Sequence, residues 1–241
     1  MTPYYEDTRA GVVIYHGDWR EVREALALSS VDHTITDPPY DARTHARARS
    51  LRGGGSDIPI DFAPLQDFAH VGELLDITRR WCLAFCALEQ LGPYQQTAGP
   101  DCWVRAGIWN RTDGTPQISG DRPAQAAEGI AIMHGPLVKK RWRRGGHRGI
   151  WSCGVVREEN RHPTQKPLAL IAQLVEAFTD PGEMVFDPYA GSGTTARACK
   201  DLGRRCICIE KQEHYCEMAA RRMGQEVLDL ETGTSGAKKS A

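Results

Sequence analysis

Short apolar runs recur along the chain, separated by polar turns and by longer segments with a different periodicity. Runs of this length, bounded by Gly, Pro, Asn and Asp, are typical of strands. Seven strands are predicted, at Val12–His16, Val31–Thr36, Trp81–Cys86, Trp103–Asn110, Gly129–Met133, Met184–Asp187 and Cys206–Ile209.

Between the strands, apolar residues recur every three to four positions, the spacing of amphipathic helices that pack on a sheet. Helices are predicted from Trp19 to about Leu28, over residues 65–80, after the third strand to about Ala98, and over Pro167–Phe178, Thr195–Leu202 and His214–Met223. Strands interleaved with helices predict an α/β fold with a doubly wound, seven-stranded sheet. We expect one domain over residues 1–230 and a disordered Gly/Ser/Lys tail over residues 231–241.

The second strand ends in the turn Asp37-Pro38-Pro39-Tyr40. Two consecutive prolines lack backbone donors and have a fixed φ, so the turn is stiff. It lies at the carboxyl end of a strand, where open α/β sheets bind ligands. Asp37 and the Pro38 carbonyl can accept the two N–H bonds of a nucleobase amine, and Tyr40 can stack on a base that has left the duplex. The alternative is a strand-ending turn in which Asp37 only caps backbone amides.

A second motif joins the sixth strand to the helix after it. The strand runs into Gly191-Ser192-Gly193, and the next strand ends in Glu210. Glycines there let the backbone pass close to a ligand, helix-start amides face it, and the acidic residue can accept both ribose hydroxyls. Ala196 stands where a dinucleotide motif has its third glycine, and because alanine is tolerated there, this position alone does not exclude NAD.

Together these motifs resemble those of the DNA amino-methyltransferases that use S-adenosylmethionine. The subgroup is the one whose Asp-Pro-Pro-Tyr precedes its Phe-x-Gly-x-Gly motif, found here within Phe186–Gly193. Two further blocks fit the family: Gly17-Asp18-Trp19, which resembles the segment beside the cofactor adenine, and His162–Pro167, which resembles the segment lining the methionine end. The likeness runs from about residue 12 to residue 223 and implies a Rossmann-like methyltransferase sheet.

The resemblance also implies site residues. Catalysis is expected at Asp37, Pro38, Pro39 and Tyr40. Cofactor contacts are expected from Asp18, Asp37, Thr164, Lys166, Phe186, Asp187, Ala190, Gly191, Ser192, Gly193, Thr194 and Glu210. A helix cap is the alternative role for Asp18. The cofactor is expected to be S-adenosylmethionine, with S-adenosylhomocysteine as product, and methyl transfer from a sulfonium needs no metal.

Two basic segments are candidates for contacts with double-stranded DNA. The first contains Arg43, Arg47 and Arg49, in a stretch without acids over residues 42–56. The second contains Lys139, Lys140, Arg141, Arg143 and Arg144, and residues 134–157 also lack acids. We expect the second to lie beside the nucleobase site and contact phosphates, as part of a small, loop-rich target-recognition insertion over about residues 134–161. That insertion divides a catalytic half, about 12–133, from a cofactor half, about 162–223. A solvated surface loop is the alternative for each segment.

The composition suits one soluble domain of 241 residues, with 41% hydrophobic and 25% charged residues. The formal net charge is −1, so affinity for DNA must come from local patches. The eight cysteines lack the spacing of a zinc site, and no apolar run approaches the roughly 20 residues of a membrane span. We expect a reduced, cytoplasmic protein of prokaryotic or phage origin, without metal or membrane.

The sequence therefore predicts a DNA methyltransferase acting on N6 of adenine, with N4 of cytosine as the alternative. In the family, Asp-Pro-Pro-Tyr mostly accompanies adenine. A methyltransferase of RNA or of a protein amide is a rival, although the basic segment and the motif order argue against a protein substrate. An idle DNA-binding module is a rival from another class, opposed by the intact Asp37 and cofactor turn. An NAD dehydrogenase is the weakest, because no catalytic His/Lys pair is evident. The small recognition region favours help from a second subunit, as in a homodimer.

Overall fold

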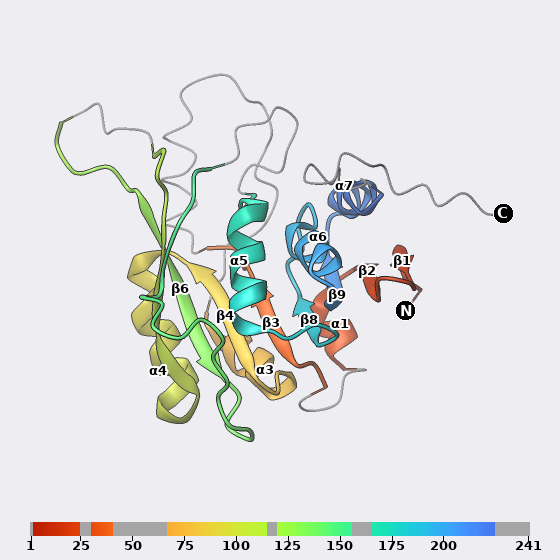
Figure 1. The fold of residues 1–241 in the computed structure, drawn as a ribbon, viewed down its shortest axis with the longest axis horizontal. Helices are drawn as coiled ribbons and strands as arrows, with labels where there is room; N and C mark the ends of the chain where they lie inside the picture. Colours follow the sequence, from red (N-terminus) through yellow and green to blue (C-terminus); the bar gives the residue numbers. More distant parts are fainter. Residues whose placement is uncertain (1, 25–29, 41–66, 115–119, 156–164, 225–241) are drawn as a thin grey trace.

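The computed structural model describes residues 2–24, 30–40, 67–114, 120–155 and 165–224. Within these residues, one nine-stranded sheet has the order β1-β2-β9-β8-β3-β4-β6-β5-β7 (Figure 1). The strands are β1 (Tyr5–Asp7), β2 (Val12–His16), β3 (His33–Thr36), β4 (Trp81–Cys86), β5 (Trp103–Asn110), β6 (Ala127–His134), β7 (Ile150–Ser152), β8 (Met184–Asp187) and β9 (Arg205–Glu210).

The helices lie between the strands, as the periodicity predicts. They are α1 (Trp19–Arg23), α3 (Ala69–Ile77), α4 (Leu91–Cys102), α5 (Leu168–Phe178), α6 (Thr194–Asp201) and α7 (Glu213–Met223), with a short 3₁₀ helix η1 (Leu88–Gln90). The expected end of the first helix, near Leu28, lies outside the described residues. Helix α4 runs beyond its expected end at Ala98, but Gly99 breaks it with a φ of 70°.

All seven predicted strands are present, and the doubly wound α/β class is confirmed. The count of seven is wrong, because β1 and β7 add a short strand at each edge of the sheet. Each has only three residues, too few for an alternating pattern to stand out in the sequence. Strand β3 also begins later than predicted, at His33, although Val31 forms an isolated bridge with Thr78.

Alternate residues of the central strands enter two separate cores, one on each face of the sheet. On β4, Leu83 and Phe85 pack in the core that contains residues of α5, α6 and α7. Cys82 and Cys86 point to the opposite core, which contains residues of α1, α3 and α4. Because side chains on both faces of β4 are buried, every position of the strand is apolar, and its sequence is a continuous apolar run.

The five consecutive strands β2, β9, β8, β3 and β4 run parallel to one another. From β8 the chain continues through α6 to β9, whereas from β3 it continues through α3 to β4, on the other side of the sheet (Figure 1). The chain thus departs in opposite directions from two adjacent strands. Such a switch point opens a crevice at the carboxyl ends of the strands, where doubly wound proteins bind their ligands.

Strand β6 runs antiparallel to both of its neighbours, β4 and β5. Its start therefore lies at the edge of the sheet where the parallel strands end, and His134 at its end pairs with Trp81 at the start of β4. The reversal sends the chain after β6 to the amino edge of the sheet, the edge away from the switch point. The second basic segment, which follows β6 in the sequence, therefore begins at the amino edge of the sheet.

Candidate active site

The turn Asp37-Pro38-Pro39-Tyr40, here called the catalytic turn after its expected role, begins where β3 ends, and β3 is buried along its whole length. Asp37 follows Thr36 directly, at the switch point between β3 and β8. The ammonium group of Lys166 donates to Asp37 Oδ2 at 2.6 Å. Lys166 belongs to the segment before α5 and is itself buried, with 7% of its side chain exposed. The structure thus brings the catalytic turn together with a lysine from the distant cofactor half.

A second carboxylate, from the start of β6, completes the group around Lys166. Glu128 accepts a hydrogen bond of 2.7 Å from the Tyr40 hydroxyl and lies 3.3 Å from Lys166 Nζ. Lys166 Nζ also lies 3.4 Å from the Tyr40 hydroxyl. It lies 5.1 Å from the ring centroid of Phe85 and 5.9 Å from that of Trp109, both within the range of a cation–π contact. Glu128 was not expected from the sequence, because a glutamate at the start of a strand belongs to no motif.

The pKa shifts in this group follow from burial and from the central ammonium. Burial raises the pKa of Asp37, and the Lys166 charge opposes that rise. Burial also disfavours the ionised form of Glu128, but Lys166, the Tyr40 hydroxyl and Arg111 outweigh it and lower the pKa of Glu128. For Lys166 burial favours the neutral amine, yet the two carboxylates prevail and raise its pKa. Lys166 therefore stays charged between two carboxylates.

One oxygen of Asp37 has no hydrogen-bond partner within the described ranges. The Asp37 side chain is 24% exposed, but its Oδ1 atom is buried and has no partner among the described residues. A buried acceptor without a donor is costly, so in native proteins such an atom is usually satisfied by a water, an ion or a ligand. The turn after β3 thus presents an acceptor whose other oxygen is already fixed by Lys166.

The turn Gly191-Ser192-Gly193, here called the cofactor turn after its expected role, lies beside the residues around Lys166, because β8 is the neighbour of β3. Gly191 and Gly193 have φ angles of 50° and 76°, which favour glycine. A Cβ atom on Gly193 would lie 2.7 Å from Ala219 Cβ, so the second glycine is also required by the close approach of α7. Helix α6 begins directly after this turn, at Thr194, with Gly193 as its N-cap.

Glu210 ends β9 next to this turn. Its two carboxylate oxygens accept the backbone N–H groups of Gly191 and Gln212, each at 2.8 Å. Burial raises the pKa of Glu210, and these backbone donors oppose the rise. Since an ionised carboxylate can accept about four hydrogen bonds, acceptor capacity remains for further donors.

Asp187 joins the two turns at the end of β8. Its Oδ1 accepts hydrogen bonds from the Thr36 hydroxyl at 2.8 Å and from the Tyr189 backbone at 3.2 Å. Burial raises the pKa of Asp187 to about 6, against these hydrogen bonds. Asp187 thus ties the strand before the catalytic turn to the cofactor turn.

Gln165 and Arg222 also hydrogen-bond to the cofactor turn and to the start of α6, and neither was among the individual site residues expected from the sequence. Gln165 Oε1 accepts from the Ser192 hydroxyl at 2.8 Å and from Arg222 at 2.7 Å. Arg222 donates as well to the Thr194 hydroxyl at 2.8 Å. Gln165 lies in the block that resembles the family segment, but only the fold shows that it reaches this turn.

The other expected cofactor residues have varied positions. Asp18 caps α1 by accepting from the Arg20 backbone at 3.0 Å, and it lies at the same edge as Glu210 because Gly17 pairs with the Glu210 carbonyl. Phe186 is fully buried in the core beneath α3 and α4. Ala190, at the start of the turn, is buried as well. Thr164, Arg43, Arg47 and Arg49 lie outside the described residues.

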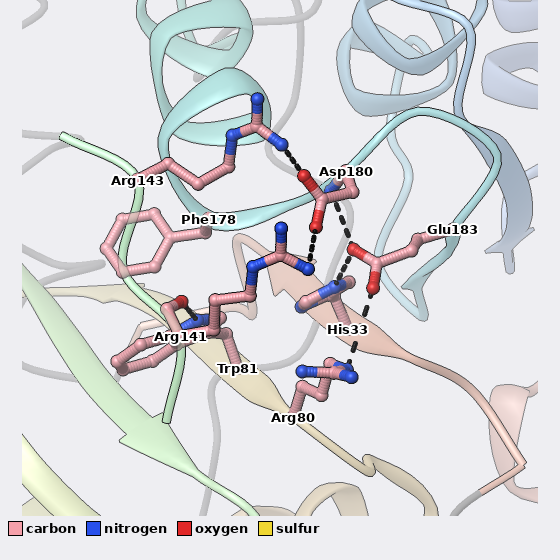
Figure 2. A pocket seen from close by; sticks show the side chains of 8 residues that line it. All are labelled: His33, Arg80, Trp81, Arg141, Arg143, Phe178, Asp180 and Glu183. Carbon is pink, nitrogen blue, oxygen red and sulfur yellow. Dashed lines mark hydrogen bonds and ion pairs between the residues drawn. The ribbon is translucent and has the colours of Figure 1, made fainter. Parts of the chain in front are cut away.

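The second basic segment lies at the amino edge of the sheet, so the expectation that it sits beside the nucleobase site is wrong. The Arg141 carbonyl accepts from Trp81, which opens β4, and Arg141 and Arg143 both pair with Asp180 after α5 (Figure 2). Arg144 pairs with Glu176. Lys139 and Lys140 are exposed in the same segment. The cause is the antiparallel direction of β6, which the sequence pattern does not reveal.

Arg141 and Arg143 also line a small pocket, whose other lining residues are His33, Arg80, Trp81, Phe178, Asp180 and Glu183 (Figure 2). His33 and Arg80 approach Glu183 at 2.8 and 3.6 Å. The pocket therefore consists of paired charges at the edge opposite the catalytic turn. Over the described ranges, no cluster of three or more His, Cys, Asp or Glu side chains is arranged to hold a metal, and no helix has the length and apolarity to cross a membrane.

Comparisons with known proteins agree with this geometry. The model of a DNA methylase family covering N6 and N4 methyltransferases matches residues 92–221, more than half of the chain. The Type II methyltransferase M.HinfI of Haemophilus influenzae is 24% identical over 90% of this chain and 72% of its own length. The Type II methyltransferase M2.DpnII of Streptococcus pneumoniae is also 24% identical, over 93% of each chain.

Two solved structures share the fold. M1.HpyAVI in complex with S-adenosylmethionine superposes with a TM-score of 0.67 and 23% identity, covering 88% of this chain and 99% of that one. The PvuII DNA methyltransferase, described as cytosine-N4-specific, also gives a TM-score of 0.67, with 14% identity over 92% of this chain and 89% of that one. The chain therefore belongs to the DNA methylase family, whose members are S-adenosylmethionine-dependent amino-methyltransferases.

Proposed function

We propose that this protein transfers a methyl group to the exocyclic N6 amine of an adenine flipped out of double-stranded DNA. The observation that carries the proposal is Oδ1 of Asp37, a buried acceptor that has no partner in the described part of the chain and lies beside a fixed ion pair at the switch point. An exocyclic amine is the kind of donor that such an oxygen accepts. The amine lies at the edge of a planar base, and a base must leave the stack before an enzyme can reach this nitrogen.

The residues of the cofactor turn fit S-adenosylmethionine. Gly191 and Gly193 provide a backbone without side chains, and Glu210 has remaining acceptor capacity for the two hydroxyls of a ribose. Asp18 and Asp187 lie at the same edge of the sheet as further candidate contacts. When bound there, S-adenosylmethionine supplies an electrophilic methyl group. A contact of Lys166 or Thr164 with the cofactor remains a prediction.

The catalytic turn orients the amine. Asp37 Oδ1 accepts one N–H bond and the Pro38 carbonyl accepts the other, which turns the nitrogen lone pair toward the methyl donor. As the nitrogen forms its new bond it becomes cationic, and the nearby carboxylate stabilises that charge. The extra proton then leaves to Asp37 or to water. Tyr40 supplies an aromatic face for the base.

N4 of cytosine is the second candidate, because cytosine offers the same arrangement of an exocyclic amine beside a ring nitrogen. The PvuII enzyme, described as cytosine-N4-specific, shares the fold, so the fold is common to enzymes acting on different bases. Adenine is favoured by residue 37. In the family Asp-Pro-Pro-Tyr mostly accompanies adenine, and a carboxylate is the stronger acceptor for an amine that gains positive charge.

The product identifies the substrate directly. The protein is incubated with mixed-sequence duplex DNA and labelled S-adenosylmethionine, the DNA is digested, and the labelled nucleoside is identified by mass spectrometry. We expect N6-methyladenine. Label in N4-methylcytosine would overturn the choice of base, and label in no nucleoside, with cofactor binding demonstrated, would overturn the DNA substrate.

The Asp37→Ala variant tests the role of the turn in the same assay. We expect turnover to be lost while the affinity for S-adenosylhomocysteine stays within about tenfold, or about 1.4 kcal/mol, because Asp37 acts chiefly on the amine. Near-normal turnover by this variant would rule out the proposed role of Asp37.

A further inference from the structure

Glu128 is a buried carboxylate at the active site that belongs to no family motif quoted above. It stands at the second position of β6, in the antiparallel part of the sheet, and 17% of its side chain is exposed. Its carboxylate accepts the Tyr40 hydroxyl at 2.7 Å and lies 3.3 Å from Lys166 Nζ. From the other side Arg111 approaches it at 3.6 Å. Glu128 is thus in contact with two residues that surround the catalytic carboxylate.

The ion pair between Lys166 and Asp37 poses an electrostatic problem for the chemistry. An amine that becomes cationic needs uncompensated negative charge nearby, yet an ammonium group lies 2.6 Å from the Asp37 carboxylate. In a buried site that positive charge is poorly screened by water. With Asp37 and Lys166 alone, the local charge would be neutral, and the advantage of a carboxylate over a neutral acceptor would be largely cancelled.

Glu128 offsets the lysine charge. Two carboxylates around one ammonium leave these three groups with a net charge of −1, which Arg111 offsets only from the far oxygen of Glu128, at 3.6 Å, and the second carboxylate draws part of the ammonium's hydrogen bonding away from Asp37. Glu128 also fixes the Tyr40 hydroxyl, and thereby the ring that faces the base. Both effects act on residues that would touch the substrate, although Glu128 itself would not.

We propose that Glu128 is a positioning residue for methyl transfer: it offsets the Lys166 charge and orients Tyr40, which keeps Asp37 Oδ1 available to the target amine. The inference rests on the proposed function, since it assumes that Asp37 accepts an exocyclic amine. The alternative is that Glu128 only neutralises Lys166 and Arg111 and so contributes to folding. The two differ in which quantity a substitution changes.

The decisive variant is Glu128→Gln, which keeps the size of the side chain and an acceptor for Tyr40 but removes the charge. We expect kcat to fall about tenfold to a hundredfold, with the affinity for S-adenosylhomocysteine and the melting temperature close to those of the wild type. Glu217→Gln is the matched control, because Glu217 is an exposed carboxylate that pairs with Arg221 on α7, and this change should leave kcat unaltered. A merely structural role would instead lower the melting temperature and leave kcat per folded molecule intact.

Two further variants keep the test decisive if Glu128→Gln fails to fold. Glu128→Asp retains the charge and should recover part of the lost kcat. Tyr40→Phe removes the hydrogen bond to Glu128 from the other side and retains the aromatic face, and it should lower kcat severalfold without changing cofactor affinity. Wild-type kcat in Tyr40→Phe, or equal kcat losses in Glu128→Asp and Glu128→Gln, would overturn the proposal.

The failure of this inference and of the proposed function would look different. If the wild type methylates cytosine instead of adenine, the base assignment fails, while a reduced kcat in Glu128→Gln on cytosine still supports the positioning role. If the wild type methylates adenine and Glu128→Gln has wild-type kcat, the positioning role fails and the proposed function stands. If the wild type binds cofactor but labels no DNA, both are overturned.

Discussion

At the scale of single residues, the active site is a set of buried charges whose ionisation depends on a few hydrogen bonds. Among these charges, the carboxyl group of Asp187 has a clearly shifted pKa, because burial raises it to about 6. The unfolded chain releases this proton near the ordinary pKa of 3.8. Between these two values the folded protein binds more protons than the unfolded one, so the contribution of Asp187 to stability falls as the pH rises.

Asp187→Asn is expected to remove this pH dependence, since an amide retains one oxygen acceptor for Thr36 and Tyr189 but does not ionise. Relative to the wild type, the variant should gain stability as the pH rises from about 4 to 6, by up to about 3 kcal/mol in the free energy of unfolding. Denaturant unfolding at several pH values without cofactor measures the difference. A difference that does not change with pH would show that Asp187 ionises normally in the folded protein.

Glu210→Ala is expected to weaken the binding of S-adenosylhomocysteine by roughly 1.5–3 kcal/mol, because a charged acceptor for two hydroxyl groups is removed. Calorimetric titration measures the affinity. Glu213→Ala is the control, since Glu213 is an exposed acid three positions further along, in the first turn of α7. Equal affinities in the two variants would show that Glu210 is only a partner for the Gly191 and Gln212 amides.

At the scale of elements, the cofactor turn depends on how closely α7 packs against it. Gly193→Ala should destabilise the protein by two separate costs, a left-handed φ of 76° and a Cβ atom 2.7 Å from Ala219 Cβ. Gly203→Ala isolates the first cost, because Gly203 has a similar φ of 70° and no atom within 4 Å of the added Cβ. Gly203→Ala should cost about 1–2 kcal/mol and Gly193→Ala about 1–3 kcal/mol more, both read from denaturant unfolding. Equal losses would mean that α7 moves aside freely.

Most elements and both main motifs could be predicted from the sequence, because their signals are local. A buried strand such as β4 is a run of apolar residues, and the turns at Asp37 and Gly191 contain residue types that only special backbone geometry favours. The direction of β6 is not a local signal, since an antiparallel strand and a parallel one have similar apolar content. Glu128 escaped notice for that reason, because its place beside Tyr40 follows from the reversal of β6.

At the scale of the whole molecule, the same reversal separates the second basic segment from the turn at Asp37. The cluster at Arg141 and Arg143 lies at the amino edge and is paired with Asp180, whereas Arg43, Arg47 and Arg49 follow the catalytic turn directly in the sequence. A duplex whose base reaches Asp37 must approach the carboxyl edge. The assignment of the Arg141 segment to phosphate contacts therefore loses its main argument.

Salt dependence of DNA binding distinguishes the two segments. Neutralising Arg43, Arg47 and Arg49 together is expected to weaken binding and to lower the slope of log K against log salt by roughly one for each lost phosphate contact. Neutralising Arg141, Arg143 and Arg144 should leave the slope unchanged. The reverse result would mean that the duplex runs across the amino edge, and that the segment contacts phosphates as the sequence first suggested.

The strand order also has a consequence for folding of the protein during its synthesis on the ribosome. Strands β8 and β9 lie between β2 and β3 in the sheet but come almost last in the chain, so the final partner of β2 emerges long after β2 itself. At roughly 5–20 residues per second, the wait between His16 and Glu210 is roughly 10–40 s. During this wait the nascent chain exposes the inner edge of β2 as unpaired backbone, and it exposes that of β3 until β8 emerges. A truncated chain ending before Met184 would lack both β8 and β9, would retain those open edges permanently, and is a natural target for chaperones and for self-association.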